Sequence, residues 1–188
     1  MKKIMEHRKT ITPDEFNEFF ANAEKRIFRV EALPEYNVPE DRAIFDKFAS
    51  GVPLPDLAPS GAAMQWFSKI KQCHDKGISF ERLRLISGKI TPYLRYEIDW
   101  CYTYSQDYGE ETRFAQLDSS SVEWQTDFFA FDDSVLIYID YDTSGSWQGF
   151  SLEEDPERRK TLLSGSLLDW EKATTMKEFL AKYRNKSL

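Results

Sequence analysis

The pattern of hydrophobic and polar residues along the chain predicts alternating helices and strands. A helix is predicted to follow Thr12, which can cap it, with Pro13 at its first position and Glu15 completing a capping box. Residues 26–31 alternate polar and apolar, which predicts a strand with one buried face. The same analysis predicts helices at 39–50, 62–76, 92–104, 155–170 and from 175 onward, and strands at 78–86, 113–117, 127–131, 134–141 and 147–152.

These elements indicate one domain of mixed class. A length of 188 residues suits a single domain over 1–188, and the proline-rich stretch 52–60 reads as a linker within the fold. Turn signals at Asp132-Asp133 and at 143–145 separate the last three strands and predict an antiparallel meander. Because the helices and strands follow no strict βαβ rhythm, we expect an α/β or α+β fold: a mixed sheet with a C-terminal antiparallel meander, flanked by helices.

Composition narrows the class of protein. The chain is 41% hydrophobic and 15% aromatic, enough to build a core. No apolar run approaches the roughly 20 residues of a membrane span, and the start is polar, so we expect no anchor or secretory signal and a cytoplasmic location. Cys73 and Cys101 lack metal-ligand spacing, so we expect both to be reduced and buried, with no cofactor.

The charge is unevenly distributed. The net charge is −7, but residues 91–155 carry 2 basic against 15 acidic residues and hold 15 of the 28 aromatic ones. This block would repel a phosphate backbone, so no direct nucleic-acid binding is expected through it. An acidic, aromatic surface would suit a cationic ligand or a basic protein partner. The favoured alternative is that the aromatic residues form the core and the acidic residues are solvated.

Two motif-like patterns are better explained by local structure. His7, Lys9 and Asp14 match the phospholipase-D-type pattern H-x-K-x4-D, but no second copy exists and Asp14 belongs to a predicted helix. The only other histidine, His74, is interpreted as a residue at a helix end. A cluster of aspartates could bind Mg²⁺ or Ca²⁺ if it met at one end of the sheet, although turns favour aspartate in any case. Its members are Asp127, Asp132, Asp133, Asp140 and Asp142.

The segment from Arg84 to Glu97 is the most suggestive for binding. It sets Arg84 and Arg95 among apolar and aromatic residues beside the acidic block. An arginine there could hold a carboxylate or phosphate ligand, or it could neutralise a buried acid. Since Arg95 and Glu97 do not share a helix face, we expect them to have different partners, with Arg95 turned toward the Asp132–Asp133 turn.

Several short stretches carry a resemblance that covers nearly the whole chain. The most specific are Tyr93 to Glu97 (YLRYE) and Asp127 to Asp133 (DFFAFDD); the others are 27–31, 35–36, 45–51, Arg84-xx-Ser87, 109–110, 155–156 and Trp170-xx-Ala173. Together they resemble a bacterial family of domains of unknown function, encoded beside XRE-type helix-turn-helix regulators and small acidic proteins. The C-terminal pattern is also distantly similar to phospholipase-D-like effector domains that lack the catalytic histidines. The resemblance implies sensing or binding instead of hydrolysis.

We therefore expect a cytoplasmic, non-catalytic regulatory accessory domain. Its partner would be a helix-turn-helix regulator or another basic protein, or a small ligand, with neither nucleic acid nor membrane bound directly. The candidate ligand-binding residues are Arg84, Tyr93, Arg95, Glu97, Asp132 and Asp133. The alternative is a phosphodiester- or nucleotide-directed enzyme, such as a toxin or defence component, with Arg84 and Arg95 as phosphate clamps and a carboxylate as base or metal ligand.

Overall fold

A mixed sheet of eight strands forms the centre of the protein. The computed structural model describes residues 7–53, 59, 61–117 and 126–184. The strands are β1 (Arg8–Ile11), β2 (Arg26–Glu31), β3 (Ser79–Ile86), β4 (Glu110–Gln116), β5 (Phe128–Phe131), β6 (Val135–Tyr141), β7 (Trp147–Glu153) and β8 (Thr174–Thr175). Their order across the sheet is β1-β7-β6-β5-β2-β3-β4-β8.

The sheet joins a parallel half to an antiparallel half at β2. β2, β3 and β4 are parallel, whereas all other neighbours are antiparallel. The predicted meander of β5, β6 and β7 is confirmed, and the fold is α+β with a mixed sheet flanked by helices. The strand predicted at 113–117 is β4, which begins at Glu110 and pairs with β3 instead of joining the meander.

The helices connect and cover the strands. They are α1 (Pro13–Asn22), η2 (Pro39–Asp41), α2 (Arg42–Ala49), α3 (Gly61–Asp75), α4 (Pro92–Tyr96), η4 (Glu97–Cys101), α5 (Tyr102–Asp107), α6 (Pro156–Lys172) and α7 (Met176–Arg184). The capping box of α1 is confirmed: the backbone N–H of Glu15 donates to Thr12 Oγ1 at 3.2 Å, and that of Thr12 donates to Glu15 Oε2 at 2.7 Å. The predicted helix at 92–104 is confirmed as α4, η4 and α5, with η4 a π-helical turn.

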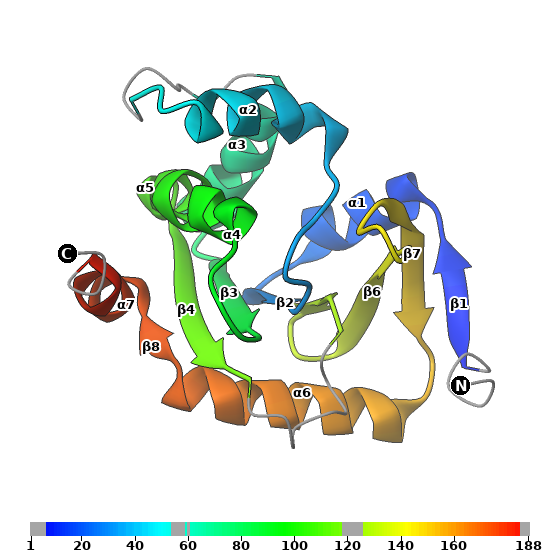
Figure 1. Cartoon of the computed structure of the whole chain (residues 1–188). Coiled ribbons are helices and arrows are strands. Elements are labelled where there is room, and N and C mark those ends of the chain that lie inside the picture. The colour runs from blue at the N-terminus through cyan, green and yellow to red at the C-terminus, as the bar shows by residue number, and fades with distance from the viewer. Residues whose placement is uncertain (1–6, 54–58, 60, 118–125, 185–188) are drawn as a thin grey trace.

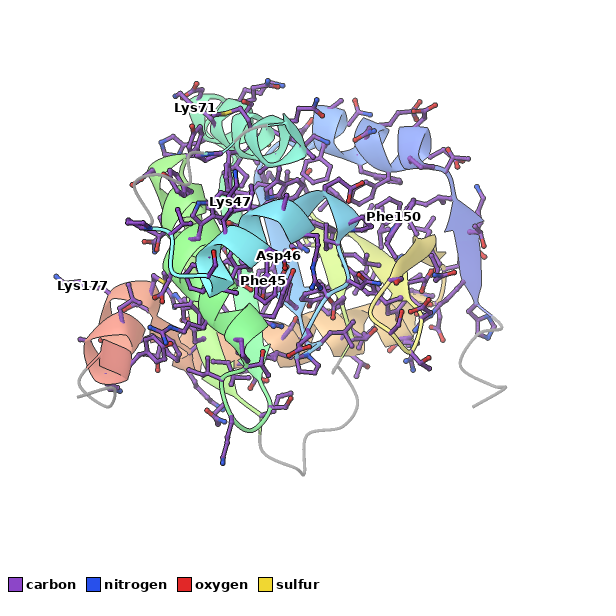
Figure 2. The ribbon with its side chains drawn as sticks, turned by 45° about the horizontal axis from the view of Figure 1, so that its top comes forward. Phe45, Asp46, Lys47, Lys71, Phe150 and Lys177 are labelled. Carbon is purple, nitrogen blue, oxygen red and sulfur yellow. The ribbon has the colours of Figure 1, made fainter. Side chains whose placement is uncertain are left out.

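The two faces of the sheet have different covers (Figure 1). On one face, α6 packs its leucines and Trp170 against apolar residues of β2, β3, β5 and β6. On the other face, α1, α3 and the α4–α5 region pack against a second core that is rich in phenylalanine. Figure 2 looks onto this second side and shows α2, with Phe45, lying in front of the sheet. Both faces of the central strands are therefore buried.

Some predicted features differ from the observed fold. β1 was not predicted, because three of its four residues are polar; it is an edge strand that pairs only with β7. The H-x-K-x4-D match starts at exposed His7 before β1 and ends at Asp14 in the first turn of α1. Most of the predicted linker at 52–60 lies outside the described residues. Among the helices that the structure describes, none is long and apolar enough to cross a membrane.

Candidate functional site

Charged side chains occupy the middle of the sheet on the face covered by α3 and α4–α5. Successive residues of a strand point to opposite faces, so Arg29 and Glu31 of β2 share a face, as do Arg82 and Arg84 of β3. The parallel register sets Arg29 beside Arg82 and Glu31 beside Arg84. Two like charges in neighbouring positions repel each other, and a carboxylate between them is needed to offset this repulsion.

Glu31 is that carboxylate and the centre of the network. Its Oε1 accepts from the Arg82 guanidinium at 2.8 Å and contacts Nη2 of Arg29 at 2.6 Å, while Oε2 accepts from the Tyr102 hydroxyl at 2.9 Å. Glu31 is 1% exposed. Burial alone would raise the pKa of this carboxyl, but Arg29 and Arg82 outweigh burial and hold it at about 2. Glu31 is therefore ionised in the folded protein at neutral pH.

The Arg82 guanidinium is buried and bonded to carboxylates on both sides. Its guanidinium also donates to Glu110 of β4, with Nε at 2.8 Å and Nη2 at 3.2 Å from the carboxylate oxygens. Arg82 therefore lies between two buried carboxylates, those of Glu31 and Glu110, and its side chain is 3% exposed. Charge-assisted pairs of this geometry are among the stronger hydrogen bonds in proteins.

A second pair joins β3 to the π-helical turn. Nη2 of Arg84 donates to Oε2 of Glu97 at 3.2 Å, and Nη1 donates to the Tyr36 hydroxyl at 3.4 Å. Arg84 is fully buried, and its Nε has no hydrogen-bond partner among the described residues. Burial, helped by the nearby Glu31 carboxylate, raises the pKa of Glu97 to about 7 although Arg84 acts in the opposite direction. Glu97 therefore keeps its proton to a higher pH than an exposed glutamate does.

Asp127, directly before β5, completes the network. Its carboxylate accepts from the Tyr36 hydroxyl at 2.5 Å and from the backbone N–H of Ala32 at 2.9 Å. Both donors are neutral, and burial raises the pKa of Asp127. The buried network thus contains three arginines and four carboxylates, and the carboxylates of Glu97 and Asp127 are the ones least compensated.

A pocket of about 300 Å³ opens directly onto this network. Its charged lining comes from β2, β3, η2 and η4: Arg29, Glu31, Glu40, Asp41, Arg82 and Glu97. Its aromatic lining comes from the loop after β2 and from α3, α4, η4 and β6: Tyr36, Trp66, Phe67, Tyr93, Trp100 and Tyr141. Pockets that bind small molecules commonly combine such apolar walls with a few convergent polar groups.

Ring contacts make the aromatic wall continuous. Tyr36 lies with its ring centroid 5.2 Å from that of Tyr141 and 6.3 Å from that of Tyr93. The ring centroid of Tyr96 lies 5.9 Å from that of Tyr93 and 5.4 Å from that of Trp100. These rings come from a loop, a strand and the 92–101 helical region, so the wall holds three separate parts of the chain in place.

The structure brings together some of the residues predicted for a site. Arg84 and Glu97 form a buried pair, and Tyr93 lines the pocket next to them. The prediction that Arg95 and Glu97 have different partners is confirmed, because Arg95 pairs with Asp99 at 3.4 Å. Its predicted orientation toward the Asp132–Asp133 turn is wrong: the side chain is 62% exposed on the outer face of the helix.

Asp132 and Asp133 lie at the opposite end of β2 from the pocket. The Asp132 carboxylate accepts from the backbone N–H groups of residues 24–26 at 2.8–3.3 Å, and Asp133 pairs with Arg26 at 3.4 Å. Arg26 and Glu31 are five residues apart on β2, or about 16 Å at the usual rise of a strand. The two aspartates therefore form a turn that anchors the start of β2, remote from the Arg84–Glu97 pair.

Sequence reasoning missed several residues of this site. Arg29, Glu31 and Arg82 stand at positions of β2 and β3 that alternate with apolar residues, and the polar face of such a strand reads as solvent-exposed. Tyr36 and Trp66 lie far in the sequence from the segment between Arg84 and Glu97. One pattern in the sequence could have revealed these residues: two predicted strands each carry charged residues two positions apart, at Arg29-x-Glu31 and Arg82-x-Arg84. Two such residues share one face of a strand, and that face can be buried under a helix.

The other candidate groups, namely a metal-binding cluster, the two cysteines and His74, do not form a reactive site among the described residues. Among the described residues, no group of three or more histidine, cysteine, aspartate or glutamate side chains could hold a metal ion. Burial raises the pKa of the Cys73 and Cys101 thiols, which are both free, so neither is an activated nucleophile. His74 is exposed at the end of α3, and its ring packs over Gly109, where an added Cβ would come within 2.5 Å of Cγ.

The acidic block does not form a single negative face. Four of its carboxylates are buried, those of Glu97, Glu110, Asp127 and Glu153. β4 and β7, which carry others, are separated in the sheet by β6, β5, β2 and β3. Most described aromatic residues of the block are buried or half-buried, as the alternative interpretation predicted, with Trp147 exposed.

Comparisons with known proteins give a family but no activity. No curated protein matches the chain. A family model described as a domain of unknown function, DUF6879, matches residues 14–181. This range begins in α1, ends in α7 and contains every residue of the buried network and the pocket. The chain therefore belongs to the DUF6879 family.

Proposed function

We propose that the protein is a non-catalytic binding domain that takes a small ligand into the pocket above β2 and β3 and acts as the ligand-responsive part of a bacterial regulatory system. The observation that carries the proposal is that four members of the buried ionic network also line the pocket, namely Arg29, Glu31, Arg82 and Glu97. The regulatory setting rests on the family resemblance of the sequence, and a helix-turn-helix partner stays a prediction.

The energetics of the network support a binding role. Moving paired charges out of water costs several kcal/mol per ion, and an apolar core of the same volume is often at least as stable. Stability alone therefore does not account for a network of three arginines and four carboxylates in this place, although breaking it by removing one partner would be destabilising. Perturbed ionisable groups in a cleft are typical of functional sites, and Glu97 is such a group.

Glu97 also supports a second candidate, an enzyme that uses this carboxyl for acid–base catalysis, because a pKa of about 7 suits proton transfer at neutral pH. The phosphate-clamp version has less support. Arg84 is fully buried and Arg95 is exposed, so the two guanidinium groups do not converge. Four carboxylates against two arginines in the lining would also repel a phosphodiester.

The proposal predicts that filling the pocket abolishes ligand retention. The full chain is incubated with a small-molecule extract of bacterial cells and freed of unbound compounds, and the retained compounds are identified by mass spectrometry. Ala62 lines the pocket and is exposed, so Ala62→Trp should occupy the space without disturbing the core. The matched control is Ala21→Trp, on the exposed face of α1.

We expect one compound to be retained by the wild type and the control variant, with at least about tenfold less in Ala62→Trp. Recovery of that compound unchanged after prolonged incubation supports binding, whereas its conversion to a product supports the enzyme. Equal retention by Ala62→Trp, or retention by none of the three proteins, contradicts the proposal.

A further inference from the structure

The pocket has a charge imbalance that its own side chains do not neutralise. Among the described lining residues, Arg29 and Arg82 are the cationic ones, and both are paired with carboxylates: Arg29 with Glu31, and Arg82 with Glu31 and Glu110. The Arg29 guanidinium also lies 5.1 Å from the ring centroid of Phe129 and 5.5 Å from that of Trp66. Both guanidinium groups are thus already paired with carboxylates, and Nε of Arg29 is a buried donor without a hydrogen-bond partner among the described residues.

The remaining lining carboxylates are poorly compensated. Glu97 has Arg84 as its only ion-pair partner among the described residues, at 3.2 Å. Asp41 stands next to Glu40 and forms no ion pair with any residue that the structure describes. Burial, with a smaller effect from Glu40, raises the pKa of Asp41, and burial likewise raises that of Glu97. Both carboxyls thus lose hydration on burial, and the nearby arginines do not fully offset that loss.

The walls are of the kind that attracts cations. Rings of tyrosine and tryptophan have negative faces, and a cation within about 6 Å of a ring centroid is attracted to that face. The pocket presents three tyrosines and two tryptophans in its lining, from η4, α3, α4, β6 and the loop after β2. Phosphates and carboxylates gain nothing from these faces.

We infer, on the basis of the binding role proposed above, that the ligand is a small organic cation, held between the carboxylates of Glu97 and Asp41 and the rings of Tyr93, Tyr141, Trp66 and Trp100. A volume of about 300 Å³ suits a compact amine, amidine or quaternary ammonium compound. A bound cation would supply the positive charge that the site lacks, so binding would favour the ionised form of both carboxyls.

The inference is tested with three probes of one shape and different charge: benzamidinium, benzamide and benzoate. Their affinities for the full chain are measured by calorimetry at about pH 8, where Glu97 is mostly ionised. We expect benzamidinium to bind at least about tenfold more tightly than benzamide, and benzoate to bind more weakly than both. Glu97→Gln should lose most of the preference for benzamidinium, whereas Glu111→Gln, a 52% exposed control on β4, should keep it.

The pH dependence gives a second readout. Glu97 faces Arg84 and Arg82 from β3, Glu31 from β2, Tyr102 from α5 and Tyr93 from α4, while Asp41 faces Glu40, Arg29 and the tyrosines of α4. Benzamidinium stays charged, so its affinity should rise from about pH 5.5 to about pH 8.5 as Glu97 ionises. Equal binding of benzamidinium and benzamide would overturn the inference but leave a ligand pocket intact. Tighter binding of benzoate would also overturn it, and binding of none of the three would count against the pocket as well.

Discussion

Replacing Arg82 by methionine is expected to lower the free energy of unfolding by about 3–5 kcal/mol, because the change leaves two buried carboxylates without their shared cation. Glu31 and Glu110 are 1% and 3% exposed, and each accepts from the Arg82 guanidinium at 2.8 Å. Because methionine keeps most of the side-chain volume of arginine, the lowered free energy of unfolding would reflect the lost charge and not a new cavity. Urea titration of the full chain measures it.

The matched control is Arg42→Met on α2. Arg42 is 70% exposed and pairs with Asp46 in the i, i+4 arrangement, which contributes little to stability in water. Its free energy of unfolding should stay within about 0.5 kcal/mol of the wild type. A loss in Arg82→Met as small as that of the control would show that the buried network is not formed in solution.

Replacing Glu97 by glutamine is expected to change the pH dependence of stability. The pKa of Glu97 is about 7 in the folded chain and about 4.5 in the unfolded chain, so the folded state holds the proton more tightly between these values. The stability that this proton contributes is fully present below about pH 4.5 and is lost as the pH rises through 7. The loss is on the order of 3 kcal/mol. Glutamine mimics the neutral carboxyl and does not titrate.

Glu97→Gln should therefore match the wild type near pH 4.5 and become more stable than it near pH 8, as measured by urea unfolding at both values. The control Glu111→Gln should keep a constant difference from the wild type, within about 0.5 kcal/mol. A Glu97→Gln protein that is less stable than the wild type near pH 8 would mean that the ion pair with Arg84 outweighs burial, and the charge imbalance of the pocket would be refuted.

Local signals in the sequence predicted most of the elements of the fold. The capping box at Thr12, the prolines that begin α1 and α6 and the turn at Asp132-Asp133 act within a few residues, so they are visible without the tertiary structure. The parallel pairing of β2, β3 and β4 was not predicted. Register between distant strands is set by the burial of both faces, which residue alternation in β2 did not reveal.

The site was predicted only in part for the same reason. Arg84, Tyr93 and Glu97 were identified because they cluster in the sequence, and the structure keeps them close. Arg95 stands two residues from Glu97 but lies on the opposite, exposed side of the helix. Arg29 and Glu31 come close to Arg82 only because β2 and β3 pair, a contact across 51 residues that composition cannot show.

The chain carries its own reporters for the location of the binding site. Trp66 and Trp100 line the pocket, Trp147 is exposed on β7, and Trp170 packs beneath the sheet on α6; Trp124 lies outside the described residues. The indole N–H signals of tryptophans are resolved in an amide NMR spectrum and can be assigned by single Trp→Phe variants. Their positions sample both faces of the sheet.

Titration of the full chain with benzamidinium, followed through these indole signals, tests most directly whether the pocket above β2 and β3 is the binding site. We expect the signals of Trp66 and Trp100 to shift together along one saturable curve while those of Trp147 and Trp170 stay in place. Shifts at Trp147 or Trp170 with none at Trp66 and Trp100 would contradict it.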